Sequence, residues 1–77
     1  MATTEELKQR IEAGLPGASV EVRGDGHHFE AVVVAPQFEG LSRIAQHRLV
    51  YDLFKGELGG RIHALSLKTK APERTAP

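Results

Sequence analysis

Three consecutive valines, Val32, Val33 and Val34, constrain the fold of this chain more than any other feature of its sequence. Neighbouring side chains of a β-strand point to opposite faces, so a run of this kind needs apolar surroundings on both faces. The run ends a segment, HFEAVVVA, that covers residues 28–35 and has the composition of a strand. We therefore expect a central strand that helices cover on one side, with only its early residues near solvent.

The residues just before this segment predict a β-hairpin. Valines alternate with polar residues across 18–23, which is typical of a half-buried strand. A Gly-Asp-Gly sequence follows at 24–26 and supplies the residue types of a tight turn. The strand over 18–23 should therefore pair antiparallel with the strand over 28–35.

Helical periodicity surrounds the hairpin. A capping box at Thr3 precedes a short amphipathic helix over residues 4–14. Ser42 fits the N-cap of a second, longer helix that runs to about residue 58, and the broad apolar arc of that helix predicts the main core element. Residues 62–69 predict a third strand. This order predicts an α+β fold in which the helices lie on one face of a three-stranded sheet.

The length of 77 residues allows one domain with a small core, so function should lie on the surface and depend on a partner. We expect the domain to span residues 1–70, and the composition of residues 71–77 predicts a disordered tail. The first residues lack the apolar core of a signal peptide, and no stretch approaches membrane-spanning length. We expect a cytoplasmic protein without membrane contact that is a monomer when free.

Charge and cysteine content exclude several classes of function. Ten basic and ten acidic residues give no net charge, which argues against a strong nonspecific nucleic-acid binder. Cysteine is absent, so disulfides and thiolate chemistry are excluded and histidine is the one soft metal ligand. No nucleophile with a base, phosphate-binding loop or carboxylate pair can be recognised from spacing. We therefore expect a protein that is not an enzyme.

Four histidines carry most of the possible chemistry. His47 falls at the edge of the apolar arc of the second helix, so we expect a ring whose nitrogen bonds a backbone carbonyl. His27 and His28 follow the hairpin turn and, as strand neighbours, point to opposite faces, so the two should not bind one ion together. His63 opens the third strand, where a core position and a position at the rim are equally compatible with the pattern.

Whether two of these histidines can act together depends on whether the hairpin turn and the start of the third strand meet at one edge of the sheet. If they do, two imidazoles face a partner molecule. Two imidazoles are too few for a closed tetrahedral zinc site, which normally takes four protein ligands. A metal bound there would have to be shared, and the incomplete site suggests a heterocomplex.

At HFEAVVVAPQFEGLSRIAQHRLVYDLF and RIHALSLKT the chain resembles the BolA family. The matching features are the HF opening of a strand, the F-x-G-L-S-R connection, the HRLVY helix core and the IHAL strand, in the family's order over about residues 4–70. The resemblance implies a KH-like α+β fold of the class II arrangement. That fold agrees with the order of elements read from periodicity.

The resemblance also implies a non-enzymatic accessory protein of iron homeostasis that pairs with a monothiol glutaredoxin. In such pairs a two-iron two-sulfur (2Fe-2S) cluster is held by the glutaredoxin cysteine and glutathione on one side and by BolA-type histidines on the other. His63 occupies the family's ligand position in the IHAL segment. His27 fits the ligand of the hairpin loop best, and His28, which matches the HF position, is the alternative.

DNA binding is the rival function, because BolA-like proteins are also described as transcriptional regulators. The second helix and the third strand would then present five basic residues, Arg48, Lys55, Arg61, Lys68 and Lys70. The absence of net charge and the lack of interleaved aromatic residues for base stacking argue against this function.

Overall fold

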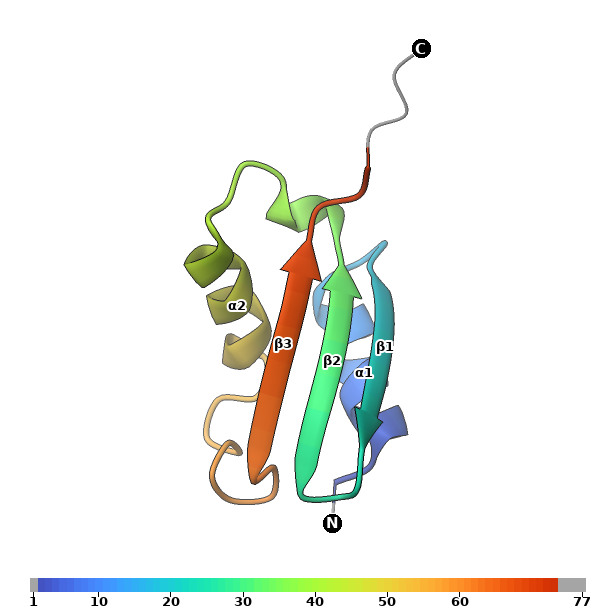
Figure 1. Cartoon of the computed structure of the whole chain (residues 1–77), viewed down its shortest axis with the longest axis vertical. Coiled ribbons are helices and arrows are strands. Elements are labelled where there is room, and N and C mark those ends of the chain that lie inside the picture. The colour runs from blue at the N-terminus through green and yellow to red at the C-terminus, as the bar shows by residue number, and fades with distance from the viewer. Residues whose placement is uncertain (1, 74–77) are drawn as a thin grey trace.

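The chain forms a three-stranded sheet with its helices packed against one face (Figure 1). The computed structural model describes residues 2–73. Its elements follow the order α1 (Thr4–Gly14), β1 (Ser19–Gly24), β2 (His28–Val34), the 3-10 helix η1 (Pro36–Phe38), α2 (Arg43–Asp52) and β3 (Ala64–Lys70). The α+β class and the order helix, hairpin, helix, strand that the sequence predicts are confirmed.

The sheet is mixed, and β2 lies between its two neighbours. β1 pairs with β2 antiparallel, whereas β3 pairs with β2 parallel, so that Val33 stands opposite Val20 on one side and Thr69 on the other. Val33 is fully buried under the helices. Val32 and Val34 are half-buried on the opposite face. The central place that the valine run predicts is therefore confirmed.

The core lies between the sheet and the helices. Thr3 caps α1, because its hydroxyl oxygen accepts a hydrogen bond from the Glu6 N–H at 3.1 Å. The η1 segment, which the sequence predicts only as a connection, places Phe38 in the core. The largest fully buried side chains are Phe38, Phe54, Leu7, Ile11, Ile62, Val33 and Val50.

The second helix is shorter than predicted and is not the main core element. α2 ends at Asp52, and residues 53–60 form turns in which Gly56 has a φ of +86°, a left-handed conformation that favours glycine. Val50 is the buried residue of α2, whereas Ile44 exposes 71% of its surface. Apolar residues beyond Asp52 reach the core from turns, so their helical spacing predicted too long a helix.

A network of two arginines and two glutamates ties these turns to α1. Arg10 Nη1 and Arg61 Nη1 lie 2.9 Å and 2.7 Å from Glu57 Oε1. Arg61 Nη2 also lies 2.6 Å from Glu6 Oε1. The pKa of Glu57 is lowered chiefly by the hydrogen bond from Arg10, and the pKa of Glu6 chiefly by the one from Arg61. The Arg10 guanidinium also lies 4.8 Å from the centre of the Phe54 ring.

The segment after β3 has no regular secondary structure over residues 71–73. Residues 74–77, which make up the rest of the predicted tail, lie outside the described residues. Within residues 2–73 no helix has the length and apolar character needed to cross a lipid bilayer.

Val33→Ala should lower the free energy of unfolding by about 2 kcal/mol, because it leaves a cavity in a fully packed core. Val32→Ala is the matched control on the uncovered face of the same strand, and it should cost less than about 1 kcal/mol. Urea unfolding at equilibrium measures both values. Equal losses would contradict the assignment of the two faces of β2.

Glu57→Gln removes the carboxylate that both arginines bind, so the variant should melt at a lower temperature than the native chain at pH 7. The pKa of Glu57 is lowered in the folded state, so its contribution is complete above the ordinary value of 4.5 and is lost as the pH falls through the folded pKa. The difference in melting temperature should therefore shrink between about pH 7 and about pH 3. The exposed Glu21, changed to Gln, is the control. A difference that stays constant down to the lower pH would contradict the network's role.

Candidate metal-ligand site

Three histidines gather at the end of the sheet where β2 and β3 begin. Because these strands are parallel, both start at the same end. His28 stands opposite Ala64, and the Ala64 N–H donates to the His27 carbonyl oxygen at 3.1 Å. His63 comes directly before Ala64. The hairpin turn and the start of the third strand therefore meet, which is the geometry that the sequence left open.

The imidazole rings of His28 and His63 contact each other. Their centres lie 5.4 Å apart, with an angle of 78° between the ring planes. Both residues are exposed. Two imidazoles on one tetrahedral ion, with metal–nitrogen bonds of about 2.1 Å, have ring centres about 5 Å apart. The observed separation therefore suits two ligands of a single metal. Within residues 2–73, His27 makes no ring contact with either of them.

Asp25 holds the turn that presents His27 and His28. Its Oδ1 atom accepts hydrogen bonds from the backbone N–H groups of both histidines at 2.9 Å. These bonds, the one from His28 first, lower the pKa of Asp25. A Cβ atom on Gly24 would lie 2.5 Å from the Phe29 ring, so a side chain there would displace the turn.

The sequence marks Asp25 only as a turn former and misses its role as a cap. The signal that could have found it is its position two and three residues before the histidines, because aspartate side chains often accept hydrogen bonds from backbone groups at this spacing.

The histidine pair is an incomplete metal site. Among the described residues, no group of three or more His, Cys, Asp or Glu side chains could hold a metal ion. The whole sequence lacks cysteine. His28 and His63 can therefore supply two ligands, and the remaining ligands would have to come from another molecule.

His47 lies apart from this cluster, beside the later part of β3. Its Nε2 atom is buried and has no hydrogen-bond partner within residues 2–73. The ring makes no other hydrogen bond to these residues either, so the predicted bond to a backbone carbonyl is wrong. The neighbouring Tyr51 packs edge-on against the His47 ring at 6.4 Å, and its hydroxyl donates to the Leu65 carbonyl at 2.8 Å. The Leu65 carbonyl is therefore bound by Tyr51, one helical turn after His47, and not by His47 itself.

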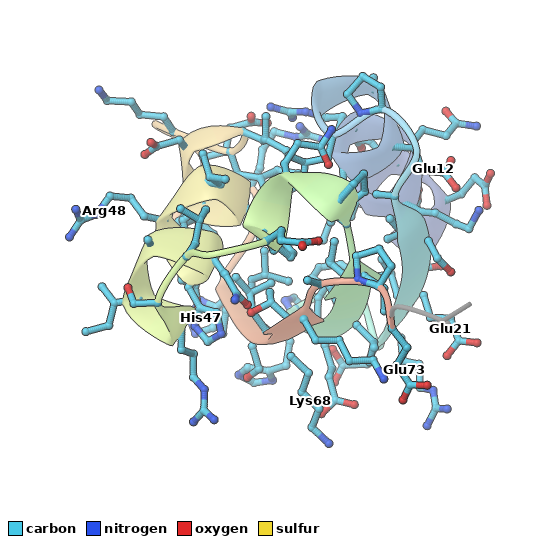
Figure 2. All side chains as sticks on the ribbon, turned by 90° about the horizontal axis from the view of Figure 1, so that it is seen from above. Glu12, Glu21, His47, Arg48, Lys68 and Glu73 are labelled. Atoms are coloured by element: carbon cyan, nitrogen blue, oxygen red, sulfur yellow. The ribbon has the colours of Figure 1, made fainter. Side chains whose placement is uncertain are left out.

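The five basic residues that DNA binding would use do not form one surface. Arg48 projects from α2, while Lys68 leaves β3 in a different direction (Figure 2). Lys70 shares the uncovered face of the sheet with Lys68, because the two residues have the same strand parity. Arg61 is bound by two glutamates, and Lys55 lies in the turns after α2. The positive charge is therefore divided among three places.

Comparison with known proteins places the chain in a family. A family model described as BolA-like protein matches residues 4–74. The chain belongs to the BolA family. The family and the fold that the HF, HRLVY and IHAL motifs implied are therefore confirmed.

Individual relatives agree with this assignment. Human BolA-like protein 1 is 36% identical over 76 residues, which cover 86% of this chain and 56% of the human protein. The structure of a bolA protein homologue from Coxiella burnetii has 52% identity and a TM-score of 0.82 over 94% of each chain. The BolA domain of SufE1 from Arabidopsis thaliana has 30% identity and a TM-score of 0.80, over 94% of this chain and 95% of that one. The chain spans about half the length of the curated relatives it matches.

Asp25→Ala should loosen the turn that carries the histidines, because two backbone N–H groups lose their acceptor. We expect amide hydrogen exchange at His27 and His28 to become about fivefold to tenfold faster. Asp25→Asn is the matched control, since its side-chain carbonyl can still accept. Unchanged exchange in the alanine variant would show that the carboxylate does not hold the turn.

Proposed function

We propose that this chain is a non-enzymatic accessory protein of iron–sulfur metabolism that forms a heterocomplex with a monothiol glutaredoxin. Its histidines would supply ligands to a 2Fe-2S cluster whose other ligands are the glutaredoxin cysteine and glutathione. The observation that carries this proposal is the contact between the exposed rings of His28 and His63, 5.4 Å apart. Membership of the BolA family supports it.

A chain without cysteine suits such a shared site. Imidazole in place of thiolate on one iron makes a cluster less negative and raises its reduction potential. The thiolates would come from the partner. The role of this chain is to hold two neutral imidazoles in place at one end of its sheet, with the Asp25 cap fixing the hairpin turn.

We assign His63 and His28 as the ligand pair and keep His27 as the alternative to His28. The sequence motif favoured His27, because it matches the loop position of the family. The ring separation favours His28, because that ring already lies beside His63. Adjacent residues cannot easily direct both rings to one ion, so one of the two should be dispensable.

Titration of a cluster-loaded monothiol glutaredoxin with this chain tests the proposal by visible absorption and circular dichroism. We expect the cluster spectrum to change up to a stoichiometry of one to one. His63→Ala should abolish the change, and His28→Ala should weaken complex formation by at least about tenfold. His27→Ala is the matched control and should leave the titration nearly unchanged. If His27→Ala weakened complex formation and His28→Ala left it nearly unchanged, His27 would be the ligand.

The same titration should weaken between about pH 7.5 and about pH 5.5, because a protonated imidazole cannot bind a metal. The glutaredoxin alone, measured over the same range, controls for loss of cluster from the partner. If the native chain leaves the spectrum unchanged, the proposal fails. DNA binding would then be tested next by a salt-dependent mobility shift in the absence of glutaredoxin.

A further inference from the structure

The outer edge of β3 faces α2. Hydrogen bonding alternates along a strand in a parallel pair, so successive residues present their backbone groups to opposite sides. Ala64 and Lys70 both bond backbone groups on the β2 side of the strand. The backbone N–H and C=O groups that point away from β2 are therefore those of Leu65, Leu67 and Thr69.

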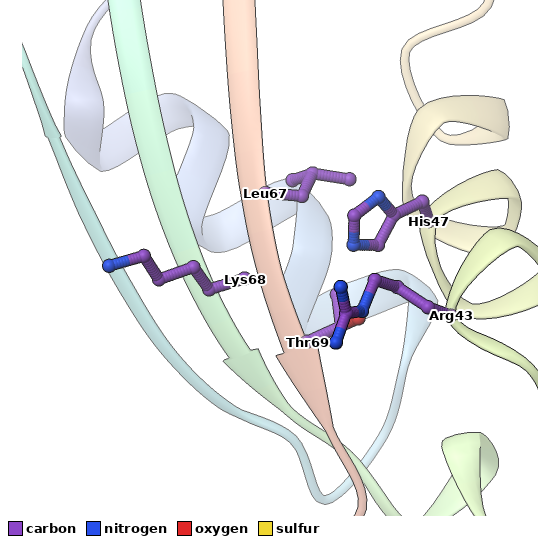
Figure 3. A pocket seen from close by; sticks show the side chains of 5 residues that line it. All are labelled: Arg43, His47, Leu67, Lys68 and Thr69. Atoms are coloured by element: carbon purple, nitrogen blue, oxygen red, sulfur yellow. The ribbon is translucent and has the colours of Figure 1, made fainter.

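Two side-chain hydrogen bonds join β3 to α2. The Tyr51 hydroxyl donates to the Leu65 carbonyl, and the Thr69 hydroxyl donates to Gln46 Oε1 at 2.7 Å. The backbone N–H and C=O groups of Leu67 and Thr69 on this side, in contrast, have no hydrogen-bond partner among residues 2–73. A cavity of about 350 Å³ opens here between α2 and β3 (Figure 3). An unpaired strand edge of this kind is a template for an added strand.

The wall opposite this edge carries cationic and polar groups without partners. Arg43 and His47 project from α2 toward the strand, whereas the Lys68 side chain points to the other side of the sheet (Figure 3). The Arg43 guanidinium makes no ion pair or hydrogen bond with any other residue of 2–73. The buried Nε2 atom of His47 is unpartnered as well, which indicates that this wall lacks part of its hydrogen-bond complement. Among the described residues, no aspartate or glutamate lines the cavity.

A second, more apolar hollow of about 310 Å³ adjoins the first and shares His47 with it. Ile44, Arg48 and Tyr51 complete its lining. Ile44 exposes 71% of its surface, more than the other exposed large apolar side chains of the described residues, Leu41, Leu49 and Leu58. The hollow can therefore take one apolar side chain, with the Arg48 cation at its rim.

We propose that the edge of β3 from Leu67 to Thr69 docks an extended acidic segment of a partner protein, which adds to the sheet as a fourth strand. The segment's backbone would pair with the free groups of Leu67 and Thr69. Its carboxylates would lie near Arg43 on one side and Lys68 on the other, and an apolar residue would enter the hollow beside Ile44. The cationic lining selects an acidic segment over a basic one.

Two features favour a peptide over a single-stranded nucleic acid. Alternating N–H and C=O groups along an edge match the backbone of an extended peptide. Sequence-tolerant binding of single strands uses aromatic side chains on which bases stack. Within the described residues no Phe, Tyr or Trp lines the larger cavity, and Tyr51, which lines the second hollow, has its hydroxyl bound to the Leu65 carbonyl.

This docking site is separate from the histidine pair. His63 precedes the first residue of β3, whereas Leu67 is its middle residue and Thr69 its last but one. The inference does not depend on the proposed cluster function, and a peptide on this edge should leave His28 and His63 unperturbed.

The test uses the full chain and a capped five-residue probe with a central valine and glutamate at the other four positions, which places carboxylates on both faces of an added strand. Binding is followed by backbone amide NMR. We expect the Leu67 and Thr69 amides to shift and to exchange more slowly, with little change at His28 and His63. A probe with lysine in place of glutamate should bind at least about fivefold more weakly. Two probes N-methylated at alternate residues should differ, because only one set of probe N–H groups faces β3.

Arg43→Gln should weaken binding of the glutamate probe about threefold, as expected for a partly exposed charge pair. Lys55→Gln, an exposed lysine in the turns after α2, is the matched control and should have no effect. Equal binding of the glutamate and lysine probes, or of both N-methylated probes, would overturn the proposal. So would the absence of shifts at about 5 mM probe, or tighter binding of a single-stranded DNA oligonucleotide at the same amides.

Discussion

Parallel pairing of β2 with β3 is the constraint on which the rest of this structure depends. Parallel strands start at the same end of a sheet, so the chain must return along the sheet after β2. η1, α2 and the turns that follow make this return and place Phe38, Val50 and Phe54 over one face. The same pairing brings His28 beside His63, because His28 is the first residue of β2 and His63 directly precedes β3.

The returning segment is held at its end by charge as well as by apolar packing. Arg10 of α1 binds both Glu57 and the Leu53 carbonyl, and its guanidinium lies against Phe54. Isolated surface ion pairs contribute little, whereas a hydrogen-bonded network on a fixed carbonyl restrains its loop more strongly. This loop leads into His63, so the network also restrains the segment that positions His63, the proposed metal ligand.

Local patterns in the sequence predicted most of the fold. The valine run predicted the central place of β2, and Thr3 predicted the start of α1. Both features depend on residues near one another in the chain, so a local pattern is enough to predict them. The predicted length of α2 was wrong, because apolar residues at helical spacing can also come from turns, as Phe54 does. The parallel register, and hence the contact of His28 with His63, depends on strands far apart in the sequence, which no local pattern specifies.

Whether the imidazoles of this chain bind iron in a shared cluster is measured most directly by pulsed electron paramagnetic resonance. The reduced complex would contain this chain with 15N-labelled histidine and an unlabelled glutaredoxin, so that any strongly coupled 15N nucleus comes from this chain. We predict coupling to two imidazole nitrogens in the native complex and to one in the His28→Ala complex. An intact one-to-one complex without 15N coupling would contradict histidine ligation.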